Sequence, residues 1–183
     1  LNVGAAFDAD GKAVASELNI GELSNAVTVN DNSDKQAVVA GSIDKLTSQI
    51  TTKGEAKFSG MNINADAESA AGTGTLRAEA KVIIADNSKI NLAEFNVRNG
   101  GSIETKSVVD TKSFIATDSK DQDPVEFNVA GTLNAANFRV QFNNTDSKVT
   151  IAAGGAYKQS AGYFWLDAGN FVIQGYAEAN WTG

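Results

Sequence analysis

The chain has 183 residues, of which 42% are hydrophobic and 20% are charged, a balance typical of a folded protein. A net charge of −7 and only three arginines leave no basic surface for phosphates, so a nucleic-acid partner is not expected. Cysteine and histidine are both absent, which excludes disulfides and removes the usual general base and the commonest metal ligand.

The length of the chain suggests a single β-rich domain over residues 1–183. No run of about 18 apolar residues is present, so we expect no membrane span. A cysteine-free chain rich in Asn, Thr, Ser, Gly and Ala is common among secreted prokaryotic surface proteins. By this association, the predicted location is extracellular or at the cell surface.

The N-terminal part begins with a short apolar strand, LNVGAAF at residues 1–7. The next stretch, DADG at residues 8–11, resembles the opening of a calcium-binding loop. An EF-hand loop requires a bidentate Glu at its twelfth position, and that position is Asn19 here. Residues 11–23, GKAVASELNIGEL, are the best helical candidate, although Gly21 interrupts the end of that segment.

Further along the chain, apolar residues occupy every second position. This alternation is typical of half-buried strands, because side chains of a strand point to opposite faces in turn. It predicts an all-β protein with at most a short helix near the N-terminus. The alternating positions are Val27 and Val29; Ala78, Ala80, Val82 and Ile84; Phe138, Val140 and Phe142; and Val149, Ile151 and Ala153.

The predicted strands are separated by turns rich in Asp, Asn and Ser. DNSDK lies at 31–35, DNSK at 86–89, and DSK at both 118–120 and 146–148. These residues hydrogen-bond their own backbone and favour tight, solvated turns. Calcium binding by their carboxylates is the alternative interpretation, and calcium is then the one cofactor to consider. The candidate ligands are Asp8, Asp10, Asp31, Asp34, Asp118, Asp121 and Asp123.

One short phrase, EFNV, occurs at 94–97 and again at 126–129, and a glycine follows each copy. Looser versions of the phrase recur with glycines roughly 20 residues apart. This period predicts a stacked β-solenoid with ~20-residue coils, because one coil cannot bury its apolar face alone. About eight coils would form a rod on the order of 40 Å long. We then expect Phe95 and Phe127 to be buried at equivalent corners.

An antiparallel β-sandwich or jelly roll is the alternative fold. Strands in such folds recur every 8–12 residues, so two strands per unit also give a period near 20. In that case the DNSK and DSK turns are hairpin loops.

The C-terminal segment, residues 156–183, is rich in aromatic side chains and is predicted to be a cap or an interface. Carbohydrate stacking is a further interpretation, but aromatic residues are enriched at protein interfaces. The two terminal strands are apolar and almost free of lysine, so their edges are candidates for pairing between copies. The predicted interface residues are Leu1, Val3, Phe7, Tyr163, Trp165, Phe171, Tyr176 and Trp181.

No catalytic motif is recognisable. The chain lacks a GxSxG nucleophile motif, a P-loop and a dinucleotide fingerprint, so we predict that the protein is not an enzyme. Two Asn-X-Thr triplets, at Asn143 and Asn180, are candidate glycosylation sites if the chain is exported.

The segments LAEFNVRNGGSIETKS and VEFNVAGTLNAANF resemble the stacked coils of filamentous-haemagglutinin-type secreted proteins. They are also similar to repeats of prokaryotic sheath, surface-layer and functional-amyloid proteins. The resemblance implies a non-catalytic extracellular structural protein that self-assembles through its β edges into a filament, sheath or surface coat. The alternative is a carbohydrate-binding or polysaccharide-acting β-domain of a secreted or phage protein, with cell-surface polysaccharide as its partner.

Overall fold

The computed structural model describes residues 1–31, 34–118, 123–167 and 169–179, and these residues form nineteen strands and no helix. The all-β prediction is therefore confirmed. The strands are β1 Asn2–Val3, β2 Ala6–Phe7, β3 Ala13–Leu23, β4 Val27–Val29, β5 Ala37–Leu46, β6 Gln49–Thr52, β7 Ala56–Ile63, β8 Thr75–Ala78, β9 Lys81–Ile84, β10 Lys89–Val97, β11 Ser102–Thr105, β12 Val108–Thr117, β13 Glu126–Val129, β14 Thr132–Gln141, β15 Lys148–Ile151, β16 Ala156–Gln159, β17 Phe164–Asp167, β18 Asn170–Ile173 and β19 Tyr176–Ala179.

The strands stack in parallel as a β-solenoid of about seven turns, with equivalent residues about 23 positions apart. At about 4.8 Å per coil the rod is roughly 35 Å long. Coils of about 20 residues were expected, and insertions such as residues 64–74 between β7 and β8 lengthen them. Among the described residues the one antiparallel pair is β2 with β3, so the sandwich and jelly-roll alternatives are excluded.

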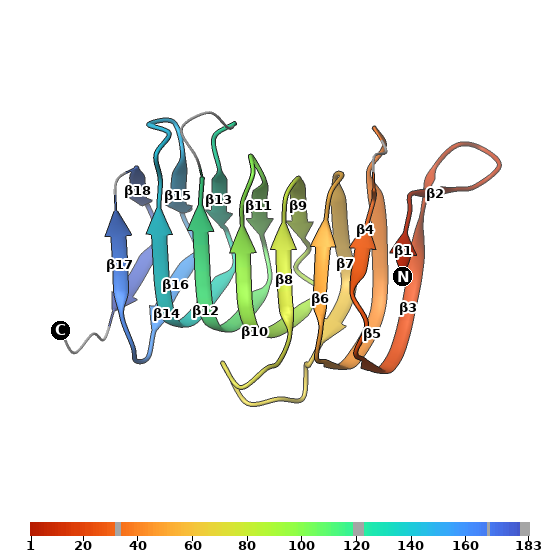
Figure 1. The fold of residues 1–183 in the computed structure, drawn as a ribbon, viewed down its shortest axis with the longest axis horizontal. Coiled ribbons are helices and arrows are strands. Elements are labelled where there is room, and N and C mark those ends of the chain that lie inside the picture. The colour runs from red at the N-terminus through yellow and green to blue at the C-terminus, as the bar shows by residue number, and fades with distance from the viewer. Residues whose placement is uncertain (32–33, 119–122, 168, 180–183) are drawn as a thin grey trace.

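Each coil has three faces, which are visible in Figure 1. The front face consists of β1, β4, β6, β8, the second halves of β10, β12 and β14, and β17. The back face consists of the first halves of β3, β5 and β7, then β9, β11, β13, β15 and β18. The base consists of the second halves of β3, β5 and β7, the first halves of β10, β12 and β14, and then β16 and β19.

The helical candidate at residues 11–23 does not form a helix, because residues 13–23 form strand β3. Val14, Leu18 and Ile20 also fit a period of two, and the strand pairs with β5 from Ala15 to Leu23. A parallel partner satisfies the backbone of β3 along its length, and tertiary pairing of this kind outweighs a weak local helix preference.

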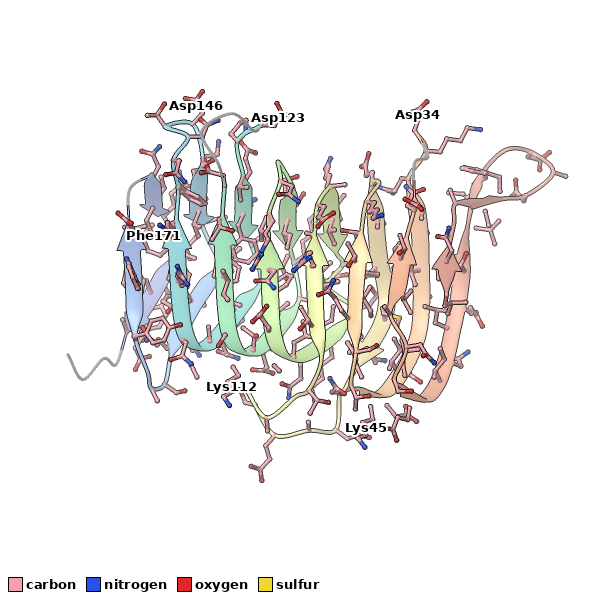
Figure 2. All side chains as sticks on the ribbon, viewed as in Figure 1. Asp34, Lys45, Lys112, Asp123, Asp146 and Phe171 are labelled. Atoms are coloured by element: carbon pink, nitrogen blue, oxygen red, sulfur yellow. The ribbon has the colours of Figure 1, made fainter. Side chains whose placement is uncertain are left out.

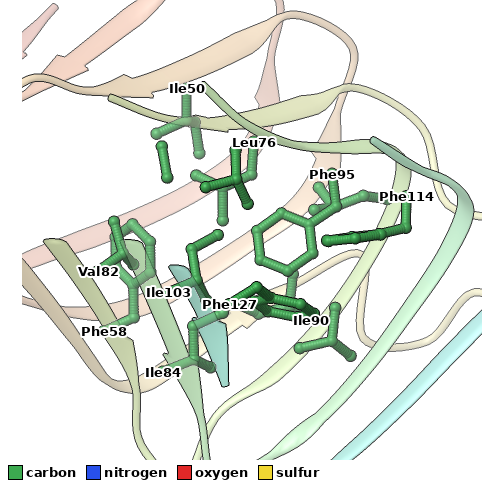
Figure 3. Packing of buried hydrophobic residues seen from close by; sticks show 14 of the residues in the cluster. Ile50, Phe58, Leu76, Val82, Ile84, Ile90, Phe95, Ile103, Phe114 and Phe127 are labelled. Atoms are coloured by element: carbon green, nitrogen blue, oxygen red, sulfur yellow. The ribbon is translucent and has the colours of Figure 1, made fainter. Parts of the chain in front are cut away.

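The core is one continuous cluster of apolar side chains in which aromatic rings stack from coil to coil (Figure 3). Phe95 is in register with Phe114 on the front face, whereas Phe127 is in register with Ile103 and Val149 on the back face. Phe95 and Phe127 are buried and meet edge to face across the core, with ring centroids 5.8 Å apart. The prediction that they occupy equivalent corners is wrong. The two EFNV copies therefore do not lie at equivalent positions of successive coils.

Glycines recur at one corner of the coil, where the chain passes from the back face to the base. Gly131, Gly155 and Gly175 each directly precede residues that are in register with one another. A Cβ on Gly155 would lie 2.1 Å from the carbonyl oxygen of Val129, and one on Gly131 would lie 2.2 Å from that of Ser107. Only a residue without a side chain permits this close approach of two coils. Gly21 has no such contact, so the glycine spacing follows the coils only in part.

Candidate functional site: the open C-terminal end

The last coil consists of β17 on the front face, β18 on the back face and β19 on the base. Each strand pairs on one side with the coil before it, namely with β14, β15 and β16 respectively. Within the described residues, no strand pairs with the other side of this coil. Three strand edges therefore present unpaired backbone N–H and C=O groups at this end.

Two inward side chains of this coil, Ile173 and Leu166, are exposed, although their counterparts one coil earlier are buried. Ile151 is 0% exposed, whereas Ile173, its partner in register, is 52% exposed. On the front face Val140 is 0% exposed and its partner Leu166 is 41% exposed. The apolar core of the solenoid is thus open to solvent at this end.

The opening forms an apolar hollow of about 350 Å³. Its lining residues are Tyr157, Phe164, Phe171, Ile173, Ala177 and Ala179. Phe164 stacks on Phe138 with ring centroids 4.8 Å apart, and Phe171 packs against Phe164 edge to face at 5.7 Å. The aromatic column of the core therefore ends in this hollow, and Figure 2 shows Phe171 at the same end of the rod.

Burial in the wall of the hollow raises the pKa of Tyr157, whose hydroxyl donates to Gln159 Oε1 at 3.2 Å. The phenol is therefore neutral at physiological pH, and it contributes a ring and one hydrogen bond to the core rather than a charge.

Three further aromatic side chains surround the opening on the outside of the rod. Trp165 lies on the front face, where the guanidinium of Arg139 is 5.1 Å from the centroid of its ring. Tyr176 lies on the base, and its hydroxyl donates to Glu178 Oε2 at 2.8 Å. That hydrogen bond and the negative charge of Glu178 raise the pKa of Tyr176. Tyr163, the third of these residues, is exposed just before β17.

The N-terminal candidates for the interface lie at the opposite end of the rod (Figure 1). Val3 is buried on the front face, and Leu1 is exposed beside it. Phe7 belongs to the hairpin of β2 with β3, and the ammonium of Lys35 is 4.6 Å from the centroid of its ring. The predicted interface residues therefore form two separate end surfaces, and Trp181 lies outside the described residues.

The candidate calcium ligands are distributed among separate turns. Asp8 Oδ1 accepts hydrogen bonds from the backbone N of Asp10 at 3.0 Å and of Lys12 at 2.9 Å, which closes the β2–β3 hairpin. Asp118 accepts hydrogen bonds from the backbone N of Asn143 and of Asn144, in the loop of the next coil.

Asp34 and Asp123 lie at the top of the view in Figure 2. Asp31 Oδ1 is 3.8 Å from Lys53 Nζ, while Asp34 and Asp123 lie on different loops. Asp121 is outside the described residues. Within the described residues, no three carboxylates converge as a metal site would require. Calcium binding stays a prediction from sequence.

The glycosylation candidate Asn143 is exposed after β14, although its Nδ2 donates to the carbonyl oxygen of Asp118 at 2.9 Å. Asn180 lies outside the described residues. In the part of the chain that the structure describes, there is no helix of the length and hydropathy needed to cross a membrane.

Sequence reasoning missed three exposed residues of the open end, Leu166, Val172 and Ile173. A signal was available for Val172 alone, because Phe171, Val172 and Ile173 are consecutive. In a strand, at least one of three consecutive residues must face outward. Comparisons with protein-family models, curated proteins and solved structures gave no match, so a function has to be inferred from the geometry of this chain.

Proposed function

We propose that the protein is a non-catalytic structural subunit that assembles head to tail into a filament. In this assembly the open C-terminal end of one copy receives the N-terminal end of the next. The single observation that supports this proposal most strongly is the exposure of Ile173 and Leu166, whose counterparts one coil earlier are completely buried.

The two ends offer matching strands on all three faces. The C-terminal end presents β17 on the front, β18 on the back and β19 on the base. The N-terminal end presents β1 on the front and the two halves of β3 on the back and base. Because every ladder between successive coils is parallel, stacking the ends in register continues the same strand direction from copy to copy. Such a contact does not close on itself and so grows into a filament.

The chemistry of the open edge favours association. Strand β18 reads Asn-Phe-Val-Ile and carries no charge, whereas natural edge strands that avoid pairing usually carry lysine or proline. Fully burying a side chain such as Ile173 or Phe171 contributes about 1.5–3 kcal/mol each, and several such groups line the hollow. These contributions add to the new backbone hydrogen bonds along three edges.

Electron microscopy and analytical ultracentrifugation of the purified protein test the proposal. We expect ordered polymers above a critical concentration. Ile173→Lys places an unpaired charge in the contact and should leave the protein monomeric. Val108→Lys is the matched control, because Val108 is also an exposed apolar residue but lies on the base, away from both ends. This control should polymerise normally.

Two results would contradict head-to-tail assembly. The first is a monodisperse monomer for the unmodified chain at all concentrations, salt conditions and calcium levels. The second is a discrete dimer, which would indicate that two C-terminal ends meet about a two-fold axis. Deletion of residues 1–7 separates these cases, since it removes β1 and β2 from the N-terminal end and should affect only the head-to-tail contact.

The proposed setting is extracellular, as a fibre, sheath or surface coat. The support is the cysteine-free composition and the net charge of −7, which keeps subunits soluble before assembly. Antibody labelling of intact source cells provides the test. Labelling that appears only after lysis would contradict this location.

A further inference from the structure

The segment of residues 64–74, between β7 and β8, leaves the corner of its coil and runs along the base beneath the following coils (Figure 1). Asn64 Nδ2 donates to the carbonyl oxygens of Thr73 at 2.9 Å and Asn91 at 2.6 Å. Asn91 Oδ1 accepts from the backbone N of Gly72 at 2.9 Å, and its Nδ2 donates to the carbonyl oxygen of Glu68 at 2.6 Å. These bonds fix the segment in one position on the base.

The tip of the segment is anchored to an almost completely buried carboxylate. Asp110, 6% exposed, accepts hydrogen bonds at Oδ1 from Ser69 Oγ at 2.6 Å and from Asn134 Nδ2 at 2.8 Å. The next residue, Ala70, has φ +59°, a left-handed conformation that costs energy for any residue with a Cβ. The surrounding bonds hold this strained turn against the base.

A groove of about 310 Å³, lined by polar side chains and by a larger area of apolar surface, begins at this tip and extends toward the C-terminal end. Its floor consists of the outward side chains of Asn134, Lys158 and Glu178, one from each of three successive coils. Ser69 and Ala70 form the wall at one end, and Ser160 adds a hydroxyl at the side. The floor groups therefore repeat along the rod at the inter-strand spacing of about 4.8 Å.

The floor offers an amide, an ammonium and a carboxylate in turn. Within the described residues the Lys158 ammonium has neither an ion pair nor a hydrogen bond, so its three donors are available. Glu178 accepts one bond, from the Tyr176 hydroxyl, and a carboxylate has capacity for more. The exposed Tyr176 ring borders the groove on the same face of the base.

We infer that this groove binds a neutral, linear, polyhydroxylated polymer, namely an uncharged polysaccharide. Hydroxyl groups donate and accept, so they match a floor on which donors and acceptors alternate. A polyanion would be repelled by Asp110 and Glu178 and by the net charge of −7. An apolar ligand would leave these polar groups without partners, which carries a large cost. The row of equivalent positions along the rod suits an extended chain better than a compact molecule.

This binding site is distinct from the assembly contact, because it uses outward side chains of the base, including Glu178 of β19, and none of the unpaired backbone groups of the three edges. Affinity electrophoresis tests it, with the unmodified protein run through native gels that contain hydroxyethyl cellulose, dextran, galactomannan or polygalacturonate. We expect retardation by at least one neutral polymer and none by polygalacturonate. Lys158→Ala should weaken that binding roughly tenfold, because it removes a hydrogen bond that the charged ammonium donates to a hydroxyl of the polymer.

The matched control is Lys148→Ala, which removes an exposed lysine from the back face and should leave the affinity unchanged. Glu178→Gln keeps the shape of the floor and should weaken binding less than Lys158→Ala does. Circular dichroism should be the same for all variants, because each substituted side chain is exposed. The inference is overturned if no neutral polymer retards the protein, if polygalacturonate alone does so, or if Lys148→Ala weakens binding as much as Lys158→Ala.

Discussion

The two ends of the solenoid differ in how much of their terminal layer of apolar side chains is exposed to water. At the N-terminal end Val3 and Leu23 are 6% and 7% exposed, and Ala5, Leu18 and Ile20 pack against the core. At the C-terminal end Ile173 and Leu166 are 52% and 41% exposed over an open hollow. One end therefore covers most of its terminal apolar layer, whereas the other leaves that layer in water.

The difference arises from a few residues at the start of the chain. Ser16 Oγ donates to the carbonyl oxygen of Gly4 at 3.4 Å, and Ala6 and Phe7 pair with Val14 and Ala13 as an antiparallel hairpin. This hairpin pairs only with the first two residues of β3, and within the described residues no strand pairs with the outer side of β3 from Ala15 to Leu23. In the proposed filament, this stretch of β3 pairs with the neighbouring copy.

The largest expected effect is a contrast in stability between the two ends. Leu23→Ala removes a buried side chain and should lower the free energy of unfolding by about 2–4 kcal/mol. Ile173→Ala, made at a half-exposed position, should cost less than about 1 kcal/mol in dilute monomer. Urea unfolding at low protein concentration measures both values. Equal losses at the two ends would show that the C-terminal hollow is covered in solution.

The same pair of variants sharpens the comparison when protein concentration is raised. If Ile173 is buried in a contact between copies, the penalty for Ile173→Ala grows with concentration, because association stabilises the folded state by mass action. The penalty for a side chain that is already buried within one copy, as Leu23 is, should change less. A difference between the two variants that does not change with concentration would contradict the burial of Ile173 in a contact between copies.

A smaller effect is expected from glycines in the two terminal coils. Gly175→Ala would place a Cβ 2.3 Å from the carbonyl oxygens of Ala152 and Gly155, so it should destabilise by about 1–3 kcal/mol. Gly21→Ala meets nothing within 4 Å, and we expect it to be neutral or stabilising by about 0.4–1 kcal/mol. Thermal unfolding of the two variants compares them directly. A loss for Gly21→Ala as large as that for Gly175→Ala would show that the N-terminal coil is closely covered.

The smallest expected effect concerns calcium. Asp8 and Asp118 lie on separate turns and already accept backbone hydrogen bonds, and no group of three carboxylates forms within the described residues. Excess chelator should therefore leave the unfolding temperature of the protein unchanged. A ligand bound only to the folded state would make that temperature fall on chelation. Such a fall would support a calcium site of the kind that the DADG and DNSDK segments suggest.

The sequence predicted which segments form the candidate site, but it did not predict all of the residues that are exposed there. The apolar, lysine-poor terminal segments pointed to both ends of the rod, and Phe171, Trp165 and Tyr176 do surround the open end. Ile173 was missed, because its exposure depends on the absence of a covering strand among the described residues rather than on its own neighbours in sequence. The groove of Asn134, Lys158 and Glu178 has no local signature at all, since each residue comes from a different coil.

The sequence by itself determined that the chain consists of β-strands. Alternation with a period of two is a property of the local backbone, and residues such as Phe138 and Val140 express it without reference to distant partners. The tertiary structure alone decided how the strands align. The two EFNV copies fall on different faces, and residues 13–23 form a strand rather than a helix. Register between coils is set by packing and backbone pairing between residues that are about 23 positions apart, and a repeated phrase of four residues does not encode such a distance.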